Sequence, residues 1–122
     1  MRTALLCALL ILTSLRVFAD EREAQLVGHW RFANERFSYE YYFGDDGTFS
    51  GSVTRDGQLA WAFAGKYRIE DDAIIYEYTK SSLERIPDGT YDRDKLVELD
   101  KDHYLIEAQD GMRRKYERVE ER

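Results

Sequence analysis

Short runs of alternating aromatic and polar residues, separated by acidic or glycine turns, fill the chain after its first nineteen residues. The clearest run spans residues 37–43, where Phe or Tyr stands at every second position, the period of a half-buried strand. The turns between the runs are Asp45-Asp46-Gly47, Asp56-Gly57, Glu70-Asp71-Asp72, Asp100-Lys101-Asp102 and Asp110-Gly111. Tight turns at this spacing predict a chain of hairpins in one antiparallel sheet.

The fold class that this pattern favours is all-β, a single antiparallel up-and-down β-barrel of about eight to nine strands. An open sheet of this size would expose two edges and leave one aromatic face in water, whereas closure removes the edges. A two-sheet sandwich remains the alternative, although short sequential turns favour the barrel. The rings expected to face inward are Trp30, Phe32, Phe37, Tyr39, Tyr41, Phe43, Phe49, Trp61, Phe63, Tyr67, Tyr76, Tyr78, Tyr104 and Tyr116.

The first residues have the pattern of a secretory signal peptide. Arg2 precedes an apolar run at 5–12, and Val17-Phe18-Ala19 offers small residues at the positions that a signal peptidase reads. A membrane anchor is the alternative, but the run falls well short of the roughly 20 residues that span a bilayer. We therefore expect residues 1–19 to be a cleaved signal peptide, residues 20–122 to form one domain, and the protein to be periplasmic or secreted.

Cleavage would remove Arg2, Arg16 and the only cysteine, Cys7, but no acidic residue, so the net charge would change from −6 to −8. An acidic surface disfavours nucleic acid and anionic lipid. Without a cysteine the domain forms no disulfide, so its core and sheet must stabilise it. We expect no membrane span and no nucleic-acid partner.

Two motifs resemble those of lipocalins and related small bacterial barrels. Gly28-His29-Trp30 resembles the Gly-x-Trp that opens the first strand in that group, and Phe43 to Phe49 resembles its Phe-x-x-Asp-Gly-Thr-Phe hairpin. The resemblance covers the chain from Leu26 to Val119. It implies a lipocalin-like fold in which Trp30 packs across the closed end and Arg118, in the last strand, covers it. Gly28, Trp30 and Arg118 would thus be structural residues.

The sequence contains no motif for catalysis or for a resident cofactor. No Gly-x-Ser-x-Gly is present, and the acidic turns lack the alternating ligands of a calcium loop. His29 and His103 are expected to be separate surface residues that bind no metal. An enzyme on this scaffold would need inward acids or a histidine clustered in a cleft. We expect a protein that is not an enzyme and that uses neither cofactor nor metal.

Two functions remain after these exclusions. In the first, the barrel binds a small apolar or amphipathic ligand, and Tyr39, Tyr41, Trp61, Tyr76 and Tyr78 line the site, because tyrosine combines apolar area with a polar tip. The irregular segment 81–92 would form a rim or lid. In the second, the interior is filled by its rings and the barrel contacts a protein partner, such as a secreted enzyme that it inhibits. A mostly filled interior is the expectation for so many inward rings.

Overall fold

The computed structural model describes residues 20–82 and 86–120, and these form one helix and eight strands. The predicted signal peptide, residues 1–19, lies outside the described residues, as do 83–85 within the predicted rim and 121–122. The elements are α2 (Glu21–Leu26), β1 (Gly28–Ala33), β2 (Phe37–Phe43), β3 (Thr48–Arg55), β4 (Gln58–Glu70), β5 (Ala73–Ser81), β6 (Tyr91–Leu99), β7 (His103–Glu107) and β8 (Arg113–Arg118).

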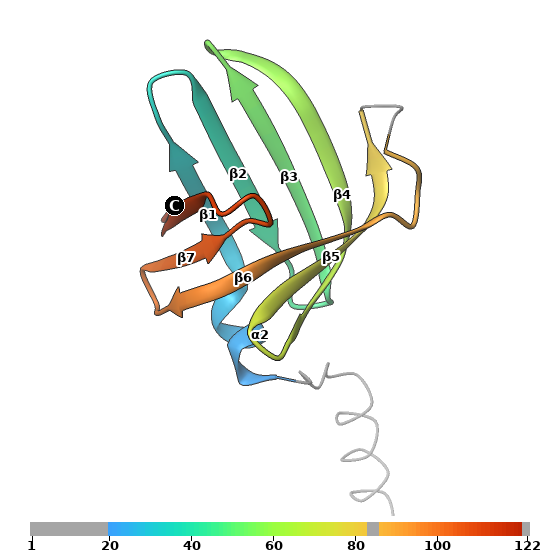
Figure 1. The fold of residues 1–122 in the computed structure, drawn as a ribbon, viewed down its shortest axis with the longest axis vertical. Coiled ribbons are helices and arrows are strands. Elements are labelled where there is room, and N and C mark those ends of the chain that lie inside the picture. The colour runs from blue at the N-terminus through green and yellow to red at the C-terminus, as the bar shows by residue number, and fades with distance from the viewer. Residues whose placement is uncertain (1–19, 83–85, 121–122) are drawn as a thin grey trace, which may run out of the picture.

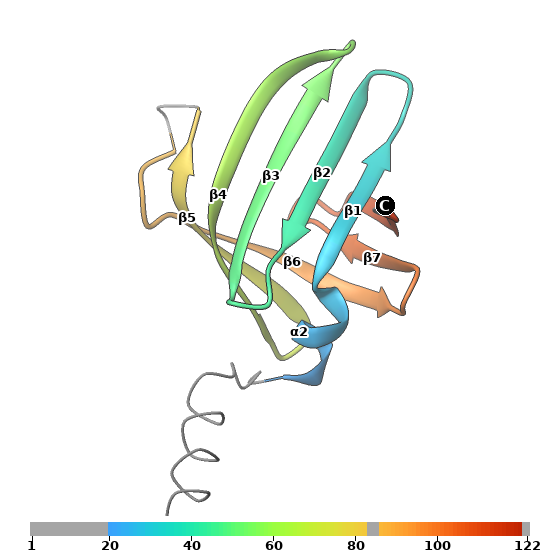
Figure 2. The ribbon, with the colours of Figure 1, turned by 180° about the vertical axis from the view of Figure 1, so that it is seen from behind.

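The eight strands pair in sequence order and close into an antiparallel barrel, which confirms the predicted fold class. Each strand pairs with its neighbours in the chain, and β1 pairs with β8 to complete the ring. Figures 1 and 2 show that β2, β3 and β4 extend beyond β6 and β7 at one end of the barrel, while α2 lies at the opposite end. We call the end where these three strands project the mouth of the barrel, and the end next to α2 the closed end.

Every one of the fourteen rings predicted to face inward belongs to the core or packs against it. Trp30 and Tyr104 are fully buried, and Tyr104 stacks on Tyr116 with ring centroids 4.7 Å apart. Tyr41 contacts Phe43 on its own strand and Phe63, Tyr76 and Tyr116 on other strands, at centroid distances of 5.5 to 5.7 Å. Such offset and edge-on contacts add to the free energy of burial. Aromatic packing therefore fills the closed half of the barrel.

The strands differ from the sequence pattern in three places. The runs around Trp61 and Tyr67 form one long strand, β4, which explains why the barrel has eight strands. Leu59 shares the two-residue spacing of Trp61 and Phe63, which pack in the core, but it is 65% exposed. A register shift between Val53 and Thr54 places Leu59 opposite Thr54, on the outer face. Finally, β6 begins at Tyr91, so the irregular segment is shorter than predicted.

The helix α2 covers the closed end of the barrel. Asp20 caps it by accepting a hydrogen bond from the Arg22 amide at 2.9 Å. Glu23 is buried, and its carboxylate accepts a hydrogen bond from the Ile69 amide of β4 at 2.8 Å. Leu26 is fully buried beside it. The helix therefore packs against the core through these two buried side chains.

Candidate binding site at the barrel mouth

Arg118 packs and hydrogen-bonds across the closed end of the barrel. Its guanidinium lies over the Trp30 ring, 4.1 Å from the centroid, and donates hydrogen bonds to the carbonyls of Val27 and Gln25, each at 2.8 Å. Trp30 itself donates from its indole nitrogen to the Leu26 carbonyl at 2.8 Å. Gly28 has a φ of 135°, and a Cβ there would collide with the Arg118 guanidinium. This is the arrangement that the resemblance implies for Gly28, Trp30 and Arg118.

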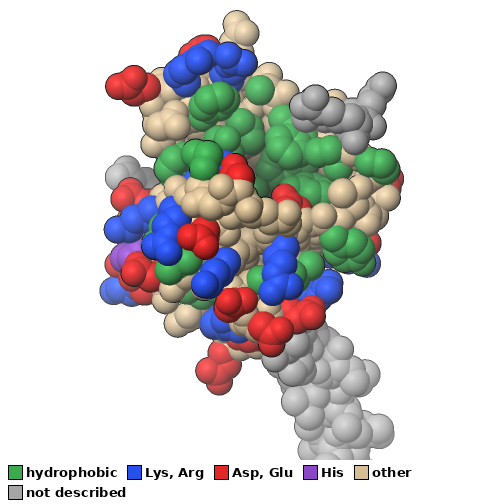
Figure 3. Space-filling model, in the orientation of Figure 1, with side chains coloured by type: hydrophobic (Ala, Val, Ile, Leu, Met, Phe, Trp, Pro, Cys, Tyr) green, Lys and Arg blue, Asp and Glu red, His purple; other side chains and the backbone are tan. Residues whose placement is uncertain are grey.

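The open end contains a pocket of about 360 Å³. Figure 3 shows hydrophobic side chains gathered in a hollow on this face, with acidic side chains at its edge. The residues that line the pocket are Tyr39, Tyr41, Trp61, Tyr78, Asp92, Asp94, Ala108, Gln109, Asp110 and Arg114. They come from β2, β4, β5, β6, β8 and the turn between β7 and β8, so strands from opposite sides of the barrel contribute to the site.

Four of the five residues predicted to bind a ligand meet in this pocket. Tyr39 and Tyr41 stand two positions apart on β2, so the strand's period of two points both rings to the same side. Trp61, half-buried on β4, donates a hydrogen bond from its indole nitrogen to the Ser81 hydroxyl at 2.7 Å. Tyr78 of β5 is buried, with its ring 6.3 Å from that of Trp61. We call the rings of Tyr39, Tyr41, Trp61 and Tyr78 the aromatic wall of the pocket.

Tyr76, the fifth residue, does not line the pocket. It is 2% exposed and packs against Phe49 with ring centroids 5.2 Å apart. Its hydroxyl makes a hydrogen bond with the Asp94 carboxylate. Tyr76 therefore belongs to the filled half of the barrel and supports the site from below.

Sequence analysis missed the charged residues of the mouth. Asp92 and Asp94 lie in β6 and share a face because they are two positions apart, and Asp110 and Arg114 complete the charged part of the lining. The one signal was the Asp-x-Asp spacing ahead of Leu96, whose side chain is buried. The spacing places both carboxylates on one face only if both residues lie in a strand, and the sequence pattern had assigned Asp92 to a loop.

The environment of Asp94 disfavours its charge. Burial raises the pKa of Asp94 to about 6, and the negative charge of Asp92 adds to the increase. The Arg114 guanidinium and the hydrogen bond from Tyr76 oppose this shift. At neutral pH the mouth therefore holds a carboxylate that burial and a like charge both destabilise.

Asp92 is fixed in place by its neighbours. Its carboxylate accepts a hydrogen bond from the Arg93 amide at 2.8 Å and longer ones, each of 3.4 Å, from the Tyr78 hydroxyl and the Gln109 side chain. Burial raises the pKa of Tyr78, and the charge of Asp92 adds to the increase, so Tyr78 remains a neutral donor at any physiological pH. The wall therefore presents acids and rings in a defined geometry.

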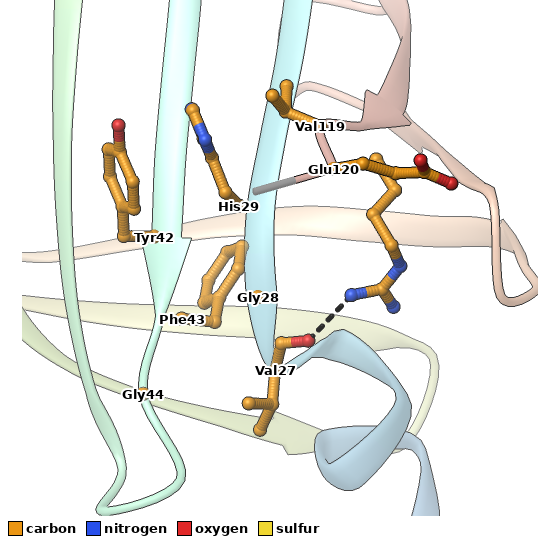
Figure 4. A pocket seen from close by; sticks show the side chains of 9 residues that line it. Val27, Gly28, His29, Tyr42, Phe43, Gly44, Val119 and Glu120 are labelled. Atoms are coloured by element: carbon orange, nitrogen blue, oxygen red, sulfur yellow. Dashed lines mark hydrogen bonds between the residues drawn. The ribbon is translucent and has the colours of Figure 1, made fainter. Parts of the chain in front are cut away.

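A second hollow, of about 570 Å³, lies outside the barrel near its closed end. Figure 4 shows His29 and Tyr42 on one side of it and Val119 and Glu120 on the other, with the hydrogen bond from Arg118 to Val27 below. His29 was expected at the surface, but it is 8% exposed, because its ring stacks on Tyr42 with centroids 4.0 Å apart. This hollow contains none of the five predicted ligand-binding residues.

Within 20–82 and 86–120, no three His, Cys, Asp or Glu side chains are grouped as metal ligands would be. In the same part of the chain, no helix has the length and apolar character needed to cross a bilayer.

The fold is that of a lipocalin-like barrel. A search of solved structures found the crystal structure of a lipocalin-like protein from Bacteroides uniformis ATCC 8492, with a TM-score of 0.56. The two sequences are 19% identical, and the match covers 78% of this chain and 99% of the other. At this identity the likeness concerns the fold. No family model matches the sequence, and neither does any curated protein.

Proposed function

We propose that this protein is a binding module that holds a small apolar or amphipathic ligand in the mouth of its barrel. The observation that carries the proposal is the pocket of about 360 Å³ lined by Tyr39, Tyr41, Trp61 and Tyr78. Pockets for small molecules are concave and mostly apolar, with a few polar groups that orient the ligand. The lipocalin-like fold suits small-ligand binding in general and is typically a binding fold instead of a catalytic one.

The size of the pocket limits the ligand. A volume of about 360 Å³ lies near the lower end of the roughly 300–1,000 Å³ that ligand sites enclose. The closed half of the barrel is filled by aromatic packing, so the ligand enters the mouth and stops above Tyr76. A compact ring system or a short chain fits, whereas a long lipid would leave much of its length in water.

Tryptophan fluorescence tests the proposal, because the two tryptophans lie at opposite ends of the barrel. Trp61 lines the pocket, whereas Trp30 is fully buried at the closed end. Titration with a panel of small hydrophobic and amphipathic molecules is expected to change the emission of Trp61. In Trp61→Phe the fluorescence response should disappear, while calorimetry should still detect binding. A panel that gives neither fluorescence change nor heat would reject the proposal.

The protein partner considered above, a secreted enzyme inhibited by a filled barrel, stays a prediction. Nothing in the described part of the chain favours it over the pocket. The exported protein would then capture a specific partner. Tyr41→Trp, which places a larger ring in the pocket, would leave that capture unchanged.

We also propose that residues 1–19 direct export and are removed. The support is the sequence pattern ending at Ala19, together with the helix cap that Asp20 provides immediately afterwards. The intact mass of the protein recovered from an exporting bacterial host should correspond to a chain that begins at Asp20. A mass that retains residues 1–19 would contradict this.

A further inference from the structure

We infer that the ligand is an organic cation, an amine or quaternary ammonium group attached to a small apolar body, held between the aromatic wall and the carboxylates of Asp92 and Asp94. This inference rests on the proposed function, because it names the class of ligand for the same pocket. It stands on two features of the lining that are independent of each other: the balance of charges and the aromatic rings that line the pocket.

The charges that line the pocket are predominantly negative. Asp92, Asp94 and Asp110 contribute three carboxylates, against the single guanidinium of Arg114. An anionic ligand would meet this excess of like charge, and a neutral one would leave it uncompensated. A monovalent cation instead relieves the repulsion between Asp92 and Asp94, and the interaction is strengthened in a partly buried site of reduced dielectric.

The rings of the pocket are suited to a cation as well. Arg114 already lies over Tyr39, with its guanidinium carbon 4.8 Å from the ring centroid. Tyr41, Trp61 and Tyr78 line the same pocket, and no described cation lies over their rings. Aromatic rings at a binding site attract alkylammonium groups, because the ring face is negative and the methyl groups prefer apolar surroundings.

A metal ion fits the site less well than an organic cation. The described residues hold no group of three metal-ligating side chains, and Asp92 already accepts hydrogen bonds from Tyr78 and Gln109. Small divalent cations require several oxygen ligands at short distance, whereas a bulky ammonium group needs only nearby charge and apolar contact.

The electrostatic surroundings of Asp94 point in the same direction. Its pKa is raised to about 6, and a cation bound beside it would stabilise its charged form. The titratable and charged groups that face it are Asp92, Asp110, Arg114, Tyr41, Tyr76, Tyr78, Tyr104 and Tyr116. Of these, only Arg114 is a cation. Cation binding should therefore weaken between pH 7.5 and pH 5, as Asp94 is protonated.

The test compares three ligands that share an octyl chain and differ in the head group: octyltrimethylammonium, octyl sulfate and octyl glucoside. Each is titrated into the protein by calorimetry below its micelle-forming concentration. The ammonium compound should bind at least about tenfold more tightly than the neutral one, and the sulfate should bind most weakly. The preference for the cation should shrink at pH 5, while the affinity for the glucoside stays constant.

Paired variants show whether the acids of the mouth cause the preference. Asp92→Asn with Asp94→Asn should abolish the preference for the cation, so that the ratio of ammonium to glucoside affinity falls to about one. Glu98→Gln with Asp102→Asn removes two negative charges from exposed positions at the far end of β6 and should change nothing. If the first double variant does not fold, Asp92→Asn alone is compared with Glu98→Gln, and a weakened preference is still expected.

The outcomes separate this inference from the proposed function. Equal or tighter binding of the glucoside would overturn the inference and leave the pocket as a ligand site. Failure of all three ligands to bind would count against both. Saturation of the site by calcium alone, with displacement of the ammonium compound, would show that the carboxylates serve a metal and would also overturn the inference.

Discussion

The stability that Asp94 contributes should depend on pH, because burial shifts its pKa. The folded pKa of about 6 exceeds the ordinary value of 3.8, so the folded protein binds this proton more tightly than the unfolded chain does. The contribution of Asp94 to the free energy of unfolding is therefore present at pH values below about 4 and is lost as pH rises through about 6. At neutral pH the charged Asp94 therefore lowers the free energy of unfolding.

Asp94→Asn should accordingly stabilise the protein at neutral pH. Asparagine keeps an acceptor for the Tyr76 hydroxyl but carries no charge. We expect a gain of about 1–2 kcal/mol at pH 7.5, after discounting for partial exposure, and almost none at pH 4. Urea denaturation at both pH values measures the difference. Asp88→Asn, in the exposed turn before β6, serves as the control, and an equal gain in both variants would contradict the assignment.

The helix α2 should contribute to the stability of the protein mainly through the buried side chain of Glu23. Glu23→Ala removes the acceptor for the buried Ile69 amide, and an unpaired buried donor costs about 1–3 kcal/mol. Glu23→Gln keeps an acceptor oxygen and should lose less. Glu21→Ala changes an exposed carboxylate of the same helix and should cost under about 0.5 kcal/mol. Thermal unfolding measures the stability of the three variants. If Glu21→Ala were as unstable as Glu23→Ala, the special role of Glu23 would be refuted.

The last strand, β8, should stabilise the closed end through Arg118. Arg118→Ala removes the guanidinium from Trp30 and leaves the Val27 and Gln25 carbonyls without their donor. The expected cost is about 2–4 kcal/mol, because cation–π contact and hydrogen bonds are lost together. Arg113→Ala, which removes an exposed ion pair with Glu107 from the same strand, should cost under about 1 kcal/mol. Denaturant unfolding compares the two, and similar losses would count against a special role for Arg118.

Elements with a strong period of two could be predicted from sequence, and elements fixed by distant contacts could not. The bounds of β2 follow directly from Phe37 and Phe43, because alternation alone defines a half-buried strand. The burial of Glu23 depends on an amide 46 positions away, which no local pattern reveals. Leu59 faces outward because of a bulge, and a bulge reverses the faces without changing the composition of the strand.

The candidate site shows the same division. Tyr39, Tyr41, Trp61 and Tyr78 could be placed on inward faces from their strands, and the barrel brings them together at one end. Tyr76 has the same pattern as Tyr78 but lies deeper, since depth along the barrel axis is set by the stagger of the strands. Asp92 and Asp94 could not be predicted as lining residues, because the sequence pattern does not show that β6 begins at Tyr91.

At the scale of the whole molecule, the barrel is closed most weakly where its first and last strands meet. β1 and β8 share two paired positions, Trp30 with Arg118 and Arg31 with Glu117, whereas β3 and β4 share eight. A hollow of about 480 Å³ lies along this seam, between Phe32 and Lys115. With no cysteine among residues 20–122, the seam has no covalent support.

Local opening should therefore begin at the seam between β1 and β8. Backbone amides are released by local unfolding with free energies that follow the number of contacts broken, so sparsely paired strands exchange first. Hydrogen exchange followed by mass spectrometry should show faster deuterium uptake in the peptide that spans residues 113–118 than in the one that spans 58–70. Arg118→Ala should accelerate the first peptide far more than the second, because that side chain anchors β8 at the closed end. Arg113→Ala should leave the order and both rates nearly unchanged. Uniform exchange across both peptides would show instead that the ring opens as one cooperative unit, with the seam as firmly held as the long hairpin of β3 and β4.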